Sequence, residues 1–309
     1  MLEVLFLGTG ASVPSRNKAT SCIAVRSGSD IVLMDCGEGS QRQIMVSPFS
    51  FMKIRAILIT HLHGDHVFGL PGLLQTMSLS GRKDPVTVYG PPGIKACVDA
   101  FMKATEGETV YPLDIVEVSG GESFRVKDLT VSVFRTEHNI TSVGFKVSEP
   151  DKPGKLDREK ALSLGVSDGP DMARLKNGES VNGVDPKDVL GPAIKGASVA
   201  YTGDTMPCQS VIDGCMGSTA LIHECTYMSE DTELAAEHAH STAIQAAEVA
   251  EKSSSTCLLL THISNRYDDL ETVEAEARTV HPDTVAVKDM QLYEVTSSGV
   301  RLSDRTPSE

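Results

Sequence analysis

The sequence predicts an α/β fold, and three features of the chain carry this prediction. In the first half, short apolar runs with the length of strands outnumber the helical patterns. In the second half, predicted strands alternate with predicted helices. Between the halves, residues 149–196 are crowded with charges, glycines and prolines, which indicates an insertion that lies outside the core.

Short apolar runs mark the strands of the first half. Residues 54–60 are almost continuously apolar, which indicates a buried strand. Pro92 favours a helix start, because proline suits the first turn of a helix. The expected strands of this half are 2–7, 23–25, 31–34, 54–60, 86–89, 113–118, 129–135 and 143–147, and the expected helices are 71–79 and 93–104.

The second half alternates the two kinds of element. Thr242 and Gln245 fit a capping box, in which each side chain satisfies a backbone amide, so a helix is expected over 243–252. The other expected elements are strands at 199–202, 220–222, 257–260, 284–287 and 291–295, a helix at 269–279, and a short helix at 157–164 inside the insertion.

Length and composition argue against a membrane protein and against a secreted, disulfide-bonded one. The chain has 309 residues, enough for one large α/β domain or two small ones, and no apolar run reaches the roughly 20 residues that span a bilayer. The N-terminus lacks the basic lead of a signal peptide. The seven cysteines form no C-x-x-C pair, which is typical of reduced thiols. We therefore expect a cytoplasmic protein without membrane contact.

The net charge of −14 argues against indiscriminate nucleic-acid binding through bulk electrostatics, although it is compatible with a local basic patch. The insertion differs from the rest of the chain in this respect. Residues 151–196 hold eight Lys or Arg and eight Asp or Glu, so the segment is neutral within an acidic protein. We interpret residues 149–196 as a protruding arm, with a disordered surface loop as the alternative.

Candidate metal ligands concentrate in the run His61-Leu62-His63-Gly64-Asp65-His66, directly after a predicted strand. Along an extended chain, His61 and His63 point the same way. The intervening glycine permits a turn that brings Asp65 and His66 toward the same cavity. Imidazole suits zinc, whereas carboxylate suits zinc or harder ions such as manganese. Four ligands that point in two directions indicate two metal ions rather than one.

Further candidates lie at the ends of other predicted strands. His138 follows the strand over 129–135, and Asp204 follows the strand over 199–202 at a point where one carboxylate can reach two metals. Asp35 ends the strand over 31–34. It is either an outer partner of a ligating histidine or a turn cap, and its sequence context leaves both interpretations open.

The H-x-H-x-D-H run with a later His, Asp and His resembles the metallo-β-lactamase fold, a four-layer αβ/βα sandwich. More narrowly, nearly the whole chain resembles the short form of tRNase Z, the endoribonuclease that processes the 3′ end of tRNA. The segments that carry this closer resemblance are Gly8-Thr9-Gly10, Asp35-Cys36-Gly37-Glu38, Gly169-Pro170, Tyr201-Thr202-Gly203-Asp204-Thr205, His223-Glu224-Cys225-Thr226, His240-Ser241-Thr242 and Thr261-His262-Ile263-Ser264.

The resemblance implies a site with two Zn²⁺ ions per subunit, with Mn²⁺ as the alternative metal. The implied ligands of the first metal are His61, His63, His138 and Asp204, and those of the second are Asp65, His66, His262 and a bridging Asp204. Asp65 is implied to handle the proton of the attacking water, and His240 paired with Glu224 to protonate the leaving oxygen.

The resemblance also implies precursor tRNA as substrate and a homodimer, in which the arm of one subunit serves the site of the other. The arm residues implied to bind substrate are Gly169, Pro170 and Lys176. Cleavage after the discriminator nucleotide would leave a 3′-hydroxyl on the tRNA. The alternatives are a phosphodiesterase of this fold that acts on small molecules, and a non-catalytic RNA-binding subunit.

Overall fold

The computed structural model describes residues 1–305. It divides into two units, one formed by residues 1–148 with the chain from 197 onward, and the other by Glu149–Gly196. No helix within residues 1–305 is long and apolar enough to cross a membrane.

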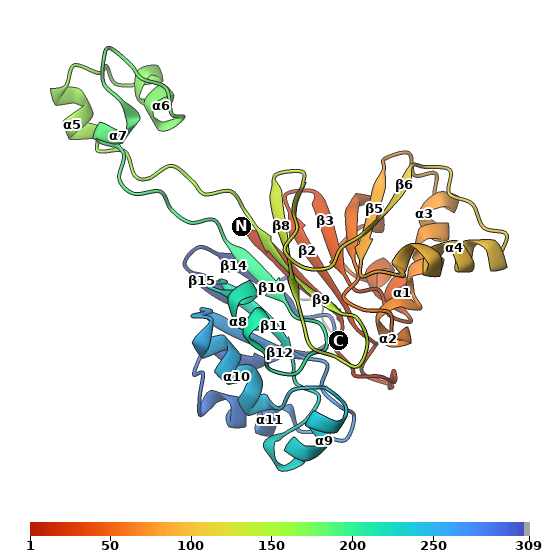
Figure 1. Cartoon of the computed structure of the whole chain (residues 1–309). Coiled ribbons are helices and arrows are strands. Elements are labelled where there is room, and N and C mark those ends of the chain that lie inside the picture. The colour runs from red at the N-terminus through yellow and green to blue at the C-terminus, as the bar shows by residue number, and fades with distance from the viewer. Residues whose placement is uncertain (306–309) are drawn as a thin grey trace. The chain divides into compact units, whose positions relative to one another are not determined.

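Two mixed sheets form the first unit (Figure 1). The eight-stranded sheet has the order β15-β14-β1-β2-β3-β4-β5-β6. Its strands are β1 (Leu2–Gly8), β2 (Cys22–Ser27), β3 (Asp30–Met34), β4 (Ile54–Leu58), β5 (Val86–Gly90), β6 (Leu113–Glu117), β14 (Leu292–Thr296) and β15 (Gly299–Leu302). The seven-stranded sheet has the order β13-β12-β11-β10-β9-β8-β7. Its strands are β7 (Ser123–Val126), β8 (Leu129–Arg135), β9 (Val143–Ser148), β10 (Ser198–Tyr201), β11 (Ala220–Glu224), β12 (Cys257–Thr261) and β13 (Thr284–Ala286).

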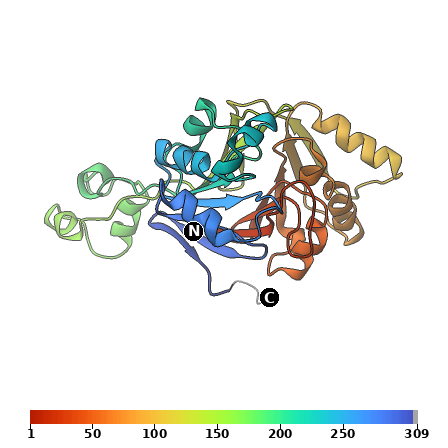
Figure 2. The same cartoon turned by 90° about the horizontal axis from the view of Figure 1, so that it is seen from below.

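Helices cover the outer face of each sheet, as Figure 2 shows from a second direction. Beside the first sheet are α1 (Ser40–Val46), α3 (Leu70–Leu79) and α4 (Ile94–Ala104). Beside the second sheet are α8 (Gln209–Cys215), α10 (Ala243–Lys252) and α11 (Leu270–Arg278). The shorter helices are η1 (Phe51–Lys53), α2 (Gly64–Val67), η2 (Ser229–Asp231) and α9 (Thr232–Glu237).

The strands are apolar on both faces because each sheet is buried on both sides. In β1, Val4 and Phe6 point into the core between the sheets, whereas Leu5 and Leu7 pack against the outer helices. The second sheet repeats this alternation between its inner core and its helices. The four layers are therefore helix, sheet, sheet and helix, the sandwich that the sequence predicts.

The second unit, Glu149–Gly196, has a small hydrophobic core of its own. Its helices are α5 (Arg158–Ser163), α6 (Pro170–Lys176) and α7 (Pro186–Val189). The Asp157 side chain caps α5 by accepting from the Lys160 amide. Seven buried side chains form the core, namely Ala161, Val166, Met172, Leu175, Val181, Val184 and Val189. The segment is therefore structured, and the disordered loop that composition left open is not what the structure has.

The expected strands and helices all occur within a few residues of their predicted bounds. The elements that the sequence did not indicate are short. They are α1, α2, α6, α7, α8, α9, β7, β15 and two single turns of 3-10 helix. Four to seven residues span at most two helical turns, too little for the apolar period to be recognised.

Candidate active site

The candidate site lies where several strands of the first unit end. His61 follows β4, His138 follows β8 and Asp204 follows β10. Strands β10, β11 and β12 run parallel, so their carboxyl ends share one edge of the sheet. Glu224 ends β11 and His262 follows β12 at that edge. The topology thus gathers side chains that are about 200 positions apart in the sequence.

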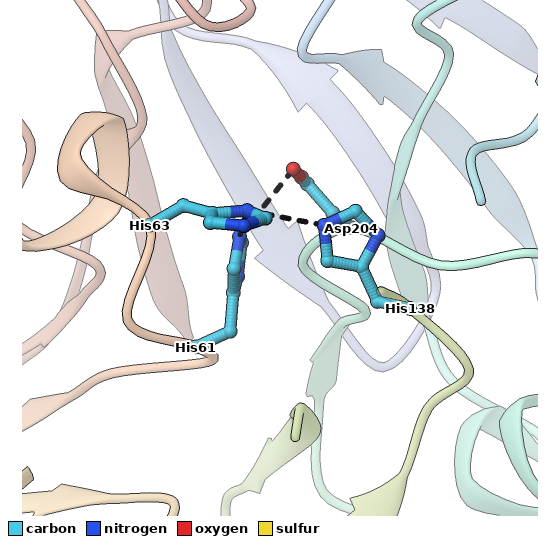
Figure 3. A group of neighbouring side chains, drawn as sticks. All are labelled: His61, His63, His138 and Asp204. Atoms are coloured by element: carbon cyan, nitrogen blue, oxygen red, sulfur yellow. Dashed lines mark hydrogen bonds and ion pairs between the residues drawn. The ribbon is translucent and has the colours of Figure 1, made fainter. Parts of the chain in front are cut away.

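One group of candidate ligands consists of His61, His63, His138 and Asp204 (Figure 3). The Nδ1 atom of His63 lies 3.1 Å from His61 Nε2 and 3.2 Å from His138 Nε2. The Oδ2 atom of Asp204 lies 3.6 Å from His61 Nε2. The four side chains reach one point from three segments of the chain.

A second group shares Asp204 and adds Asp65, His66 and His262. His262 Nε2 lies 3.4 Å from His66 Nε2 and 3.3 Å from Asp65 Oδ2. Asp204 Oδ2 lies 3.3 Å from His66 Nε2 and 3.4 Å from His262 Nε2. These are all of the ligand positions that the sequence predicts, and the structure brings them together.

The spacing of these atoms fits metal coordination. Two ligand atoms each about 2.0 Å from a tetrahedral ion are about 3.3 Å apart, close to the separations in both groups. Asp204 is also buried, and its Oδ1 atom has no hydrogen-bond partner within residues 1–305. A buried carboxylate oxygen without a donor is costly, and a cation would satisfy it. The donor set therefore suits metal ions.

The outer nitrogen of four imidazoles is held by a partner, which leaves the inner nitrogen's lone pair free. His66 Nδ1 donates to Asp35 Oδ2 at 2.7 Å, and His138 Nδ1 donates to the Ala239 carbonyl at 2.8 Å. His61 Nδ1 lies 3.0 Å from Thr60 Oγ1. His262 Nδ1 lies 2.9 Å from Thr226 Oγ1. Such outer contacts fix ring orientation and tautomer in metal sites.

The role of Asp35, left open by the sequence, is that of an outer partner of a histidine. Besides His66, its carboxylate accepts from the Thr60 amide at 2.8 Å and from the Tyr201 hydroxyl at 2.9 Å. Its backbone φ of 56° lies in the left-handed region, where a non-glycine residue is unusual. The fold therefore fixes this carboxylate firmly beneath the imidazole of His66.

Glu224, which is buried, and His240, which is half-buried, form an ion pair beside the second group. Glu224 Oε1 lies 2.8 Å from His240 Nδ1 and also accepts from the backbone amides of Thr205 and Ser241. Its Oε2 accepts from the amide and the hydroxyl of Thr226. Burial disfavours the charge on His240, but the Glu224 carboxylate outweighs it and raises the pKa of His240 to about 9.

In three candidate ligand histidines nothing outweighs burial, which lowers the pKa of His61, His63 and His138, so these rings favour the neutral form. In His66, burial is outweighed by the carboxylates of Asp204 and Asp35, which raise the pKa. The neutral ring is the form that binds a metal. Four of the candidate ligands line an open cavity of about 830 Å³ together with His240, and this cavity is large enough for part of a polymeric substrate. These four are His63, Asp65, His138 and Asp204.

Sequence reasoning missed the outer residues Thr60 and Ala239. No local pattern identifies them, because each acts through one hydroxyl or carbonyl that only the fold places. Tyr201 and Thr226 were recognised only as parts of motifs. The predicted arm residues Gly169, Pro170 and Lys176 belong to the second unit, where Pro170 begins α6 and Lys176 ends it.

Comparisons with known proteins agree with this geometry. A family model described as anti-Pycsar protein Apyc1 matches residues 2–152, which is less than half of the chain. The ribonuclease Z of Bacillus licheniformis is 41% identical over 304 residues, covering 95% of this chain and 99% of the relative. The ribonuclease Z of Methanothermobacter thermautotrophicus is 42% identical over 299 residues, covering 96% and 97%.

Solved structures give the same result. The short form of human tRNase Z has a TM-score of 0.69 and 28% identity, and the match covers 95% of this chain and 99% of that one. The metallo-β-lactamase fold protein YhfI from Bacillus subtilis has a TM-score of 0.68 at 20% identity, with 94% and 98% covered, and supports the fold alone. With full-length identity of about 40% to its curated relatives, the chain belongs to the ribonuclease Z family of metal-binding hydrolases.

Proposed function

We propose that this ribonuclease Z removes the 3′ trailer of precursor tRNA by one cut just after the discriminator nucleotide, leaving a 3′-hydroxyl. The observation that carries the proposal is the pair of ligand groups that share Asp204, with the Glu224–His240 ion pair beside them. This arrangement combines sites for cations with a candidate proton donor in one cavity. Both are useful for hydrolysing a phosphodiester.

We further propose two Zn²⁺ ions per subunit, with Mn²⁺ as the alternative. His61, His63 and His138 would hold one ion, Asp65, His66 and His262 the other, and Asp204 both. When bound, such a pair of ions activates water and neutralises charge on the phosphate oxygens. Zinc is favoured because five of the seven ligands are imidazoles.

The side chains of the protein then have separate tasks. Asp65 orients the attacking water, since its Oδ2 is fixed by the Ser12 amide at 2.9 Å and faces the second ligand group. His240 donates a proton from Nε2 to the 3′-oxygen as the bond between phosphorus and that oxygen breaks. Glu224 holds His240 through Nδ1, which keeps Nε2 directed at the cavity.

The arm is proposed to bind the folded part of the tRNA, away from the cut. Gly169, Pro170 and Lys176 are the proposed contacts, and Gly169 has a φ of 104° that favours glycine. Folded RNA is recognised largely through backbone and shape, which suits a neutral segment with dispersed lysines and arginines. We propose a homodimer, with each arm serving the partner's site.

The test is cleavage of a tRNA with a 3′ trailer, with both product ends mapped, beside hydrolysis of a small chromogenic phosphodiester. The proposal requires one cut after the discriminator nucleotide, a 3′-hydroxyl on the tRNA and a 5′-phosphate on the trailer. Hydrolysis of the diester without cleavage of the tRNA would keep the hydrolytic site and reject this substrate.

A further inference from the structure

Phe68 is the one aromatic side chain within residues 1–305 that is mainly exposed, at 62% of its surface. The chain has eight Phe, six Tyr and no Trp, and the other thirteen rings are buried or half-buried. Exposing an aromatic ring to water forgoes the free energy of burying it. Packing within the core therefore does not account for this position.

Phe68 lies beside the candidate metal ligands. It directly follows α2, the short helix that carries Asp65 and His66, and its amide donates to the Gly64 carbonyl at 2.9 Å. The ring lines the same cavity as His63, Asp65 and His240. An exposed apolar ring thus stands in the wall of a site whose other walls supply ligands and a proton donor.

The Phe68 ring packs against the backbone of Gly64. A Cβ atom at Gly64 would lie only 2.2 Å from Phe68 Cε2, so the ring rests directly against the backbone of Gly64. A glycine at this position leaves room for the ring, which is 62% exposed and lines the cavity. An exposed aromatic ring in the wall of a cavity is an arrangement on which unpaired nucleobases stack.

We propose that Phe68 is a stacking platform for one of the two unpaired nucleobases that flank the cut. The inference rests on the proposed function, because it requires RNA in this cavity. Stacking would hold the flanking nucleotide, and through it the phosphate, over the ligand groups. It is indifferent to base identity, since every base has a π-face, so it suits tRNAs and trailers of differing sequence.

The experiment compares Phe68→Ala, Phe68→Leu and Phe68→Trp on a tRNA with a 3′ trailer. We expect kcat/KM to fall about ten-fold in the Ala and Leu variants, and the Trp variant to retain activity. Leu keeps an apolar side chain but removes the π-face, so it separates stacking from simple burial. Leu79→Ala, at a 90% exposed position ending α3, is the matched surface control.

Abasic substrates then locate the contact. Removing the base of the discriminator nucleotide, or of the first trailer nucleotide, should abolish the difference between wild type and Phe68→Ala at one of these positions. A penalty that persists with both abasic substrates would overturn the inference, as would full activity in Phe68→Leu. Bound metal and melting temperature, measured for each variant, exclude damage to the fold. Failure of the wild type to cut precursor tRNA would instead reject the proposed function.

Discussion

The hydroxyl of Thr226 connects the two chemical parts of the site. It donates to Glu224 Oε2 at 2.8 Å and lies 2.9 Å from His262 Nδ1, from which it can accept. One side chain therefore orients a candidate metal ligand, His262, and the carboxylate that holds His240. Because only the fold brings these three residues together, Thr226 is the sharpest test of the site's outer contacts.

Replacing Thr226 with valine keeps the shape of the side chain but removes the hydroxyl. We expect metal affinity to fall about 10- to 100-fold, because His262 loses the partner that fixes its ring. Chelator competition measures this affinity. Thr226→Ser should restore it, since serine keeps the hydroxyl, and an unchanged affinity in Thr226→Val would show that the contact does not matter.

His240→Ala should lower kcat by about 10²- to 10⁴-fold and leave the metal content unchanged, because His240 is assigned to proton transfer and not to metal binding. A precursor with sulfur in place of the bridging 3′-oxygen at the cut provides the control. A thiolate leaves without a proton, so this substrate should be cut by the variant almost as fast as by the wild type. Loss of metal from His240→Ala, or an equal defect on the sulfur substrate, would refute the assignment.

At the scale of single residues, the sequence identifies the candidate ligands better than the residues that hydrogen-bond to them. His61 to His66 are recognisable because four side chains of metal-ligating type occur within six positions, a local density that chance seldom produces. Asp35 was ambiguous because capping and outer-shell roles use the same short carboxylate next to glycine. Nothing in the sequence identifies the Ala239 carbonyl, because every residue has a carbonyl. Only the structure marks this residue as unusual, through its φ of 55°.

At the scale of elements, the arm can be deleted without interrupting the strands on either side of it. Strands β9 and β10 pair antiparallel, with Ser148 opposite Ser198, so a short turn can join them directly. Hydrophobic contacts within the arm form a core of its own, and the three cores of the first unit are formed by first-unit residues alone. Replacing residues 151–195 with such a turn should therefore leave a folded protein.

The arm-deleted protein should show a much higher KM for precursor tRNA and nearly unchanged hydrolysis of a small phosphodiester. The reason is that the arm is assigned to the folded tRNA body, which the small diester lacks. Steady-state kinetics on both substrates measure the difference. An equal loss on both, with an intact melting transition, would mean that the arm supports the site and not the substrate.

The long elements were all predictable from the sequence, whereas most of the short ones were not. Strands such as β4 are almost continuously apolar because helices cover one face of the sheet and the second sheet covers the other. Helix α9 has six residues, fewer than two helical turns, and β7 has four, so each repeats its apolar pattern too few times to be recognised. Such short elements are placed by tertiary contacts, which a local pattern does not contain.

At the scale of the whole molecule, the proposed dimer predicts that two defective subunits can complement each other. One carries the arm deletion with an intact site, and the other carries His240→Ala with an intact arm. Random mixing should restore about a quarter of wild-type cleavage, because half of the dimers are mixed and each has one served site. A mixture as inactive as its components, or a monomer in sedimentation, would contradict an arm that acts on the partner.

The two sheets explain why one site needs the whole chain. His66 and His262 are 196 positions apart, yet their Nε2 atoms lie 3.4 Å apart because strands from both sheets end at the same side of the sandwich. The ligand set is complete only when both sheets have formed and packed. A metal bound there would stabilise the native state alone, so metal affinity and folding are linked.

The most direct test of the two-metal account is a titration of metal-stripped protein with Zn²⁺, in which bound metal per subunit and cleavage of precursor tRNA are measured on the same samples. The account predicts that metal binding saturates at two ions per subunit and that cleavage reaches its maximum only there. Full cleavage with one ion, or with none, would contradict it.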